Sequence, residues 1–261
     1  MVTLSWKNIF FVLLASLFFI GIIVISLNIL SGSLLVLFIL LIIHALAGKY
    51  RFLTSLFISF LLSFLVYQYV NNYIDSRDMS LEIKTLIKRS MLIFIVFGLV
   101  FTKIFYKQRT FAFTKLPKWN KRITLPFHTI KLSNFLLIGL IVSSTIFIPL
   151  FIYKEISYVK QMLVFGILFS VINASLEEII WRDILLSSLK RYVSTFYAIV
   201  ITSVGFGLLH ISIGIPLIIS LLFSLGGLFY ATVVLKTNSI YPAIVFHFVI
   251  NLGMVFNGWI I

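Results

Sequence analysis

The sequence contains no cysteine, which excludes disulfide bonds, thiolate catalysis and cysteine-based metal sites. Charge is also scarce, because only 11% of the 261 residues are charged and only seven are acidic. A soluble domain carries about 25% charged residues. With 61% hydrophobic residues, the chain lacks the side chains needed to cover a surface exposed to water, and we expect lipid to surround it.

Apolar runs approach the length of about 20 residues that a membrane-spanning helix needs. We expect nine such runs, at 8–30, 32–48, 52–70, 90–106, 134–153, 161–189, 194–212, 215–235 and 240–260, of which the second is short. The predicted fold is all-α: a polytopic transmembrane helical bundle of about eight or nine spans, with the active site in the helix interior. Gly227 and Ala231, four residues apart, predict a close helix contact within the chain.

Lys and Arg are three times as numerous as Asp and Glu, 21 against seven, and give a net charge of +14. Because they lie between apolar runs, we attribute them to loops that orient the chain in the bilayer, not to nucleic-acid binding. With the N-terminus inside, fourteen basic residues fall on the cytoplasmic side and six, Arg89 among them, on the other. The predicted location is a multi-pass position in a membrane, by composition a bacterial cytoplasmic membrane.

Residues 107–133 form the long basic loop of the sequence, with Trp119 among its Lys and Arg residues. One interpretation is a contact with anionic lipid on the cytoplasmic face. The other is a solvated loop that sets the topology. The two are equally good on the sequence alone.

An ionisable side chain inside a span costs about 2.5–3.5 kcal/mol even on a lenient scale, so each one needs a reason. Apart from Lys103, which is counted with the basic loop that follows its span, the predicted spans hold seven: His44, Glu177, Glu178, Arg182, Asp183, His210 and His247. All the acids among them follow the basic loop. His44 has no polar neighbour in its span and is interpreted as a structural residue.

The acids at 177 and 178 are expected to have different roles. Glu178 and Arg182 are four residues apart and can form an ion pair on one helix face. Glu177 is rotated by about 100° from Glu178, so the two carboxylates are not expected to point at one centre. Since Arg182 compensates only one acid, Glu177 is left for chemistry. Asp183 is attributed to an internally neutralised packing network or to the cytoplasmic end of the helix, where basic residues follow.

Polar residues on two further spans can join Glu177. His210 lies one turn after Phe206, and His247 and Asn251 share a helix face. A carboxylate beside a neutral imidazole can hold a water molecule and take its proton, and Asn251 could orient His247 or stabilise an oxyanion. Alternatively, Glu177, His210 and His247 match the ligand count of a hydrolytic zinc site. The cofactor stays open, with a divalent metal such as zinc as one option.

Three short motifs, each on a separate predicted span, resemble those of the CPBP family of intramembrane proteases, which includes the CAAX prenyl endopeptidases and the bacterial Abi proteins. They are E-E-x-x-x-R at 177–182, F-x-x-x-H at 206–210 and H-x-x-x-N at 247–251. The resemblance covers roughly residues 134–261. It implies three parts: N-terminal transmembrane helices (1–106), a basic cytoplasmic loop (107–133) and a CPBP-like protease core (134–261).

The resemblance also implies roles. Glu177 would be the catalytic carboxylate that activates water with the help of His210, while His247 and Asn251 would complete the site and stabilise the oxyanion. Two residues would support them: Glu178 and Arg182. Whether a metal participates is left open by the motifs.

The function predicted from these residues is an intramembrane endopeptidase that hydrolyses a membrane-associated peptide or protein. One alternative is a non-enzymatic membrane scaffold or bacteriocin-immunity protein that binds a partner. Another is a transporter or proton relay, which the absence of paired broken helices disfavours. The expected partners are the lipid bilayer and a membrane peptide. The sequence does not identify the substrate or the oligomeric state.

Overall fold

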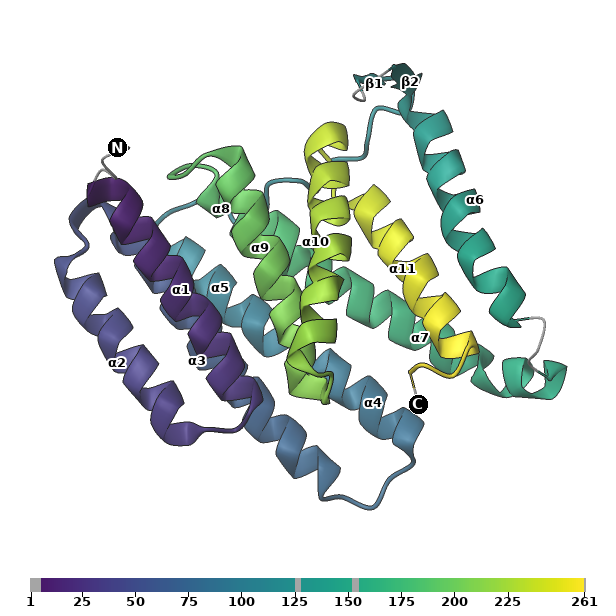
Figure 1. Ribbon diagram of the computed structural model, residues 1–261, viewed down its shortest axis with the longest axis horizontal. Coiled ribbons are helices and arrows are strands. Elements are labelled where there is room, and N and C mark those ends of the chain that lie inside the picture. Colours follow the sequence, from purple (N-terminus) through teal and green to yellow (C-terminus); the bar gives the residue numbers. More distant parts are fainter. Residues whose placement is uncertain (1–5, 125–127, 152–154, 261) are drawn as a thin grey trace.

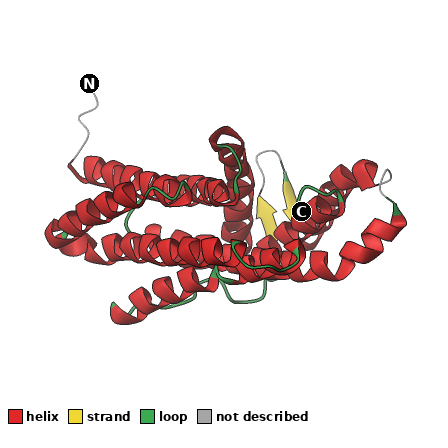
Figure 2. Ribbon diagram, turned by 90° about the horizontal axis from the view of Figure 1, so that it is seen from below, coloured by secondary structure: helices red, strands yellow, loops and turns green. Residues whose placement is uncertain are grey.

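A computed structural model describes residues 6–124, 128–151 and 155–260. Its helices, in chain order, are α1 (Trp6–Ser26), α2 (Leu30–Leu46), η1 (Gly48–Tyr50), α3 (Arg51–Asp75), α4 (Leu81–Ser90), α5 (Ile93–Phe105), α6 (Leu132–Phe151), α7 (Ile156–Glu178), η2 (Ile179–Leu186), α8 (Ser187–Leu189), α9 (Thr195–Leu209), η3 (His210–Ile213), α10 (Leu217–Thr237) and α11 (Tyr241–Phe256). A short antiparallel ribbon, β1 (Arg122–Thr124) with β2 (Thr129–Lys131), pairs Ile123 with Ile130. Apart from this ribbon the regular structure of the described chain is helical, which confirms the predicted all-α class (Figure 2).

The helices have the length and composition of a polytopic membrane protein. Among the described residues, six stretches can cross a membrane: Asn8–Ser26, Gly48–Asp75, Leu81–Phe105, Ile156–Leu189, Thr195–Ile213 and Leu217–Thr237. Three shorter apolar helices lie at Leu30–Leu46, Leu132–Phe147 and Tyr241–Phe256. Each of the nine predicted runs overlaps one of these nine stretches.

Helix α4 was not predicted, because its sequence is polar and the expected fourth span began only at residue 90. Its local signals nevertheless favour a helix. The Ser80 side chain accepts a hydrogen bond from the backbone N–H of Ile83, and Glu82 lies in the first turn. Lys88 and Arg89 lie in the last turn, where positive charge complements the helix dipole.

Successive long helices run in alternating directions, so the connecting segments gather at two ends of the molecule (Figure 1). Of the described residues, the basic end contains 47–50, 106–124, 128–131, 190–194 and 238–240. Hydrogen bonds across it join the N–H of Ile240 to the carbonyl of Phe113 at 2.9 Å, and Lys236 to the carbonyl of Thr124 at 3.0 Å.

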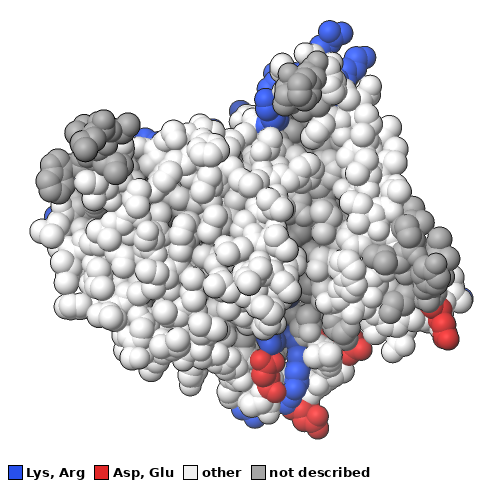
Figure 3. All heavy atoms as spheres, viewed as in Figure 1, with Lys and Arg blue, Asp and Glu red and all other residues white. Residues whose placement is uncertain are grey.

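The opposite end is called the mixed-charge end, because it carries acids as well as basic residues. It contains residues 27–29, 76–80, 210–216 and 257–260. The Asn72 side chain donates to that of Asn28 at 2.9 Å, and the Tyr158 hydroxyl donates to the carbonyl of Val255 at 3.2 Å. In Figure 3 the acidic side chains on the visible face lie at this end, and basic side chains mark the ribbon at the other.

Trp181 joins the N-terminal helices to the C-terminal ones in one continuous core. It is fully buried in η2, and its ring lies 5.2 Å from that of Phe60 in α3 and 6.5 Å from that of Phe18 in α1. On the other side, a Cβ at Gly205 would come within 2.6 Å of the Trp181 ring, so the absence of a side chain there makes room for it. The two halves therefore share the packing that holds the site helix η2.

His44 has a partner from outside its own helix. Its Nδ1 lies 2.9 Å from the hydroxyl of Thr54 in α3. His44 is partly buried, and this hydrogen bond satisfies its polar group. The contact supports the interpretation of His44 as a structural residue, which stays a prediction.

The contacts of Asp183 differ from those expected for it. It is fully buried, and its Oδ1 accepts hydrogen bonds from the backbone N–H groups of Ala112 and Phe113 at 2.7 and 2.6 Å. It thus anchors the basic loop to η2 instead of pairing with the basic residues that follow it. The partner lies about 70 positions away, so local spacing could not reveal it.

Candidate active site

The candidate site begins where the helix changes its winding. α7 ends at Glu178 and continues without a break into η2, which is π-helical. Such wide turns often occur at functional sites. The last two residues of the α-helical part are Glu177 and Glu178, and Arg182 follows within η2.

Glu178 forms a buried ion pair with Arg182. Its Oε1 lies 3.2 Å from Nη1 of Arg182 and accepts from Nδ1 of His247 at 3.0 Å. Arg182 also donates to the carbonyl of Gly227 at 3.2 Å and lies over the ring of Phe206 at 4.5 Å. Glu178 and Arg182 are at most 1% exposed, and the predicted pair between them is confirmed.

The close helix contact predicted at Gly227 is also present within the chain. A Cβ there would lie 2.8 Å from the Cα of Ser203 in α9. This tight packing of α10 on α9 brings the carbonyl of Gly227 within reach of Arg182.

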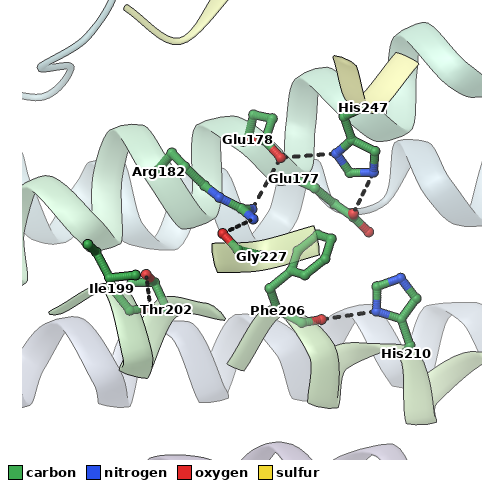
Figure 4. Close-up of polar contacts among 9 residues, drawn as sticks. All are labelled: Glu177, Glu178, Arg182, Ile199, Thr202, Phe206, His210, Gly227 and His247. Atoms are coloured by element: carbon green, nitrogen blue, oxygen red, sulfur yellow. Dashed lines mark hydrogen bonds and ion pairs between the residues drawn. The ribbon is translucent and has the colours of Figure 1, made fainter. Parts of the chain in front are cut away.

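Glu177 touches the same imidazole from its other edge (Figure 4). Its Oε2 lies 3.6 Å from Nε2 of His247, and its Oε1 lies 3.7 Å from Nη1 of Arg89. The two carboxylates were not expected to point at one centre, and they do not converge on one point, but they share one imidazole. The two nitrogens of one imidazole lie on different edges of the ring, so a single histidine reaches both acids.

Arg89 is the main site residue that sequence reasoning missed. It was assigned to a loop on the outer side, but it is only 9% exposed and compensates Glu177, which was expected to lack a cation. The N-cap and the charge distribution of α4 could have indicated a helix here. The contact with α7 could not be read from spacing.

His210 lies across from His247, and in Figure 4 the carboxylate of Glu177 points between the two rings. Nδ1 of His210 is 3.0 Å from the carbonyl of Phe206. Because a carbonyl only accepts, this nitrogen carries the proton and Nε2 is left as an acceptor. The ring of Phe223 stacks on that of His210 at 4.2 Å and fixes its plane.

Two amides complete the polar surroundings. Asn251, one turn after His247, is 5% exposed, and its Nδ2 has no hydrogen-bond partner among the described residues. Asn173, one turn before Glu177, is 4% exposed, and its Oδ1 is likewise without a partner there. A buried donor and a buried acceptor are thus available to a guest molecule.

These side chains surround a cavity of about 700 Å³. Its polar wall includes Arg89, Asn173, His210, His247 and Asn251. The remaining wall is mostly apolar and aromatic, and comes largely from α10, α11 and the connection between α9 and α10. Tyr67 of α3 and Tyr230 of α10 also line it, the latter stacked on His247 at 4.8 Å.

A zinc ion holds its histidine and carboxylate ligands at about 2.0–2.2 Å, so three ligand atoms must converge on one point. Among the residues that the structure describes, no three His, Asp or Glu side chains are grouped in this way. The zinc site considered from the sequence, with Glu177, His210 and His247 as ligands, does not fit the side chains as they lie.

Comparison with known families agrees with this geometry. Residues 158–253 match the family model of type II CAAX prenyl endopeptidase Rce1-like proteins. This stretch, less than half of the chain, is similar to that family and is called the Rce1-like domain. The match confirms the resemblance to the CPBP proteases. No curated protein and no solved structure matches the chain.

The Rce1-like domain extends from the start of α7 to the last turn of α11 and contains every site residue predicted from the sequence. Arg89 and Tyr67 lie outside it, on α4 and α3. The cavity wall is therefore made by the domain together with helices that precede it.

Proposed function

We propose that this protein is an intramembrane endopeptidase that hydrolyses a peptide bond of a membrane-associated peptide or protein with an activated water molecule. The observation that supports this most is the position of Glu177, between imidazoles from two other helices and beside a cavity within an Rce1-like domain. The protein is an integral, multi-pass membrane protein with its N-terminus in the cytoplasm, as the distribution of its basic residues indicates.

Glu177 acts as the general base. It takes one proton from water, and the oxygen attacks the carbonyl carbon of the scissile bond. His210, with Nδ1–H held by the carbonyl of Phe206, accepts from the same water through Nε2 and orients it. The proton on Glu177 then passes to the leaving nitrogen, the C–N bond breaks, and an acid and an amine are formed.

Asn251 acts on the developing charge, while His247 packs beside Glu177. The unpaired Nδ2 of Asn251 donates to the carbonyl oxygen as it becomes an oxyanion, an interaction that strengthens in the transition state. Glu178 holds Nδ1–H of His247 and thereby fixes the tautomer and the plane of the ring. Arg182 holds the Glu178 carboxylate in place, so both are positioning residues.

Arg89 positions Glu177 in the same way. Its guanidinium contacts the carboxylate through one nitrogen and also lines the cavity. The 3.7 Å separation is longer than a normal hydrogen bond, so the carboxylate stays free to bind water.

The proposal is tested by the protein termini that the enzyme creates. Membranes from cells that express wild type, Glu177→Gln or Glu155→Gln are compared by mass spectrometry of newly formed N- and C-termini. Glu155→Gln is the matched control, because it removes a carboxylate from the other end of α7. We expect Glu177→Gln to lower cleavage by about 10²- to 10⁴-fold and the control to behave as wild type.

Full cleavage by Glu177→Gln would overturn the mechanism. Absence of any terminus that depends on the protein, with a cellular phenotype that survives Glu177→Gln, would favour the scaffold or immunity function instead.

A further inference from the structure

The mouth of the cavity lies at the mixed-charge end. Its rim includes Asp75 and Lys88, which form an ion pair at 2.7 Å with side chains 52% and 24% exposed. The turn after His210 contributes Ser212 and Ile213, and the end of the chain contributes Trp259, which is 61% exposed. From this rim the cavity extends inward to the polar wall around Glu177.

In the opposite direction the site is closed. Eight residues of η2 continue from Glu178 toward the basic end, and Trp181, Arg182 and Asp183 among them are at most 1% exposed. Asp183 fixes the backbone at Ala112 and Phe113 over this helix. The carbonyl of Phe113 in turn accepts from the N–H of Ile240, so the basic loop is held against the start of α11.

The charge on the two ends differs in a way that orients the molecule. Within 107–131 the sequence has seven Lys and Arg residues and no acid, and none of the described residues of this segment forms an ion pair. The acids outside the buried cluster are Asp75, Asp78, Glu82 and Glu155, which belong to the segments around the mixed-charge end. Lys and Arg are retained preferentially on the cytoplasmic side of a membrane. The basic end is therefore the cytoplasmic one.

The rim also has an apolar side. Ile219 and Leu222 on the first turns of α10 line the cavity and are 49% and 60% exposed. A substrate segment anchored in lipid can therefore reach the cavity along α10 without crossing a polar surface.

From these observations we propose that the active site opens away from the cytoplasm, and that its substrate is a membrane-anchored peptide segment presented at the extracytoplasmic face. The peptide nature of the substrate rests on the proposed function. The direction of the opening rests only on the cavity, the closed side and the charge distribution.

The absence of cysteine makes a direct test possible, since every introduced thiol is unique. Three variants are made: Ser212→Cys at the rim, Asp78→Cys as a reference on the same end, and Lys118→Cys in the basic loop. A membrane-impermeant maleimide is added to right-side-out and to inverted vesicles. We expect Ser212→Cys and Asp78→Cys to react only in right-side-out vesicles and Lys118→Cys only in inverted ones.

Labelling of Ser212→Cys only in inverted vesicles, together with Lys118→Cys, would overturn the inference. Thr85→Cys, also on the cavity wall, replaces Ser212→Cys if that variant does not fold. The same set is made on a Glu177→Gln background, where the same pattern is expected. If the protein proves not to be a protease, the expected labelling pattern stays the same. If cleavage is intact but the labelling pattern is reversed, only the proposed direction of access is rejected.

Discussion

Glu177 and Glu178 are neighbours in the sequence, each lies beside an arginine, and both touch His247. Glu178 is held at 3.2 Å by an arginine of its own helix and at 3.0 Å by the imidazole. Glu177 has looser contacts, at 3.7 and 3.6 Å, and its arginine comes from a helix outside the Rce1-like domain.

This difference shows that two buried acids of one motif can have different roles, one structural and one catalytic. A buried ion pair with tight geometry is costly to break and serves to fix its neighbours. A carboxylate that lies directly behind residues of a cavity wall, and is held at a distance, can still exchange a proton with water. We therefore separate a structural pair from a reactive acid, and each experiment below tests that separation.

The largest effect on stability is expected when the buried ion pair of Glu178 with Arg182 is broken. Arg182→Met leaves Glu178 buried without its cation, which should destabilise the fold by about 3–5 kcal/mol. Thermal unfolding of the detergent-solubilised protein measures this. The double variant Arg182→Met with Glu178→Gln should recover part of the loss, because no uncompensated charge remains. Unchanged stability in Arg182→Met would contradict the structural role assigned to the ion pair of Glu178 with Arg182.

On the reactive side, His210→Phe should lower cleavage by about 10²-fold, since it removes the acceptor that orients water. The matched control is His44→Phe. His44 is another histidine of the helical bundle, but it lies in the last turn of α2 near the basic end, does not line the cavity, and is hydrogen-bonded to Thr54. We expect the control to keep its cleavage rate. Equal loss in both variants would mean that packing, and not the water, explains the effect.

A smaller loss of cleavage is expected when Arg89, the cation beside Glu177, is replaced. Arg89→Met should reduce cleavage by about 10-fold, because one long charged contact contributes about 1.5 kcal/mol. Lys88→Met is the control, since this neighbouring cation lines the same cavity but pairs with Asp75. Arg89→Lys should restore part of the rate. If Lys88→Met lost as much as Arg89→Met, general charge at the rim would be responsible instead.

The smallest effect is expected far from both acids. Thr54→Val removes the hydrogen bond to His44 and should cost about 1 kcal/mol of stability with no change in cleavage. Thermal unfolding and the terminus assay are measured on the same preparation. A loss of cleavage here would extend the reactive region into the N-terminal helices.

The sequence predicted those features that depend on spacing within one helix. The pair of Glu178 with Arg182, the adjacent turn of His247 and Asn251, and the apolar runs all follow from helical geometry. The motifs also located the Rce1-like domain. The division of the chain at 106 and 133, and the lipid contact of the basic loop, stay predictions.

What the sequence did not predict are contacts between elements that lie far apart along the chain. Arg89 meets Glu177 across 88 positions, and Asp183 meets Phe113 across 70. Helical periodicity says which face a residue occupies but not which other helix covers that face. The sharing of His247 by both acids is of the same kind, because it depends on the relative placement of α7 and α11.

The most direct test applies one substitution to two adjacent positions. Glu177→Gln and Glu178→Gln are compared for cleavage and for thermal unfolding under identical conditions. We predict that Glu177→Gln unfolds at the wild-type temperature but does not cleave, whereas Glu178→Gln unfolds at a lower temperature and retains measurable cleavage. A stable, inactive Glu178→Gln beside an active Glu177→Gln would contradict the account.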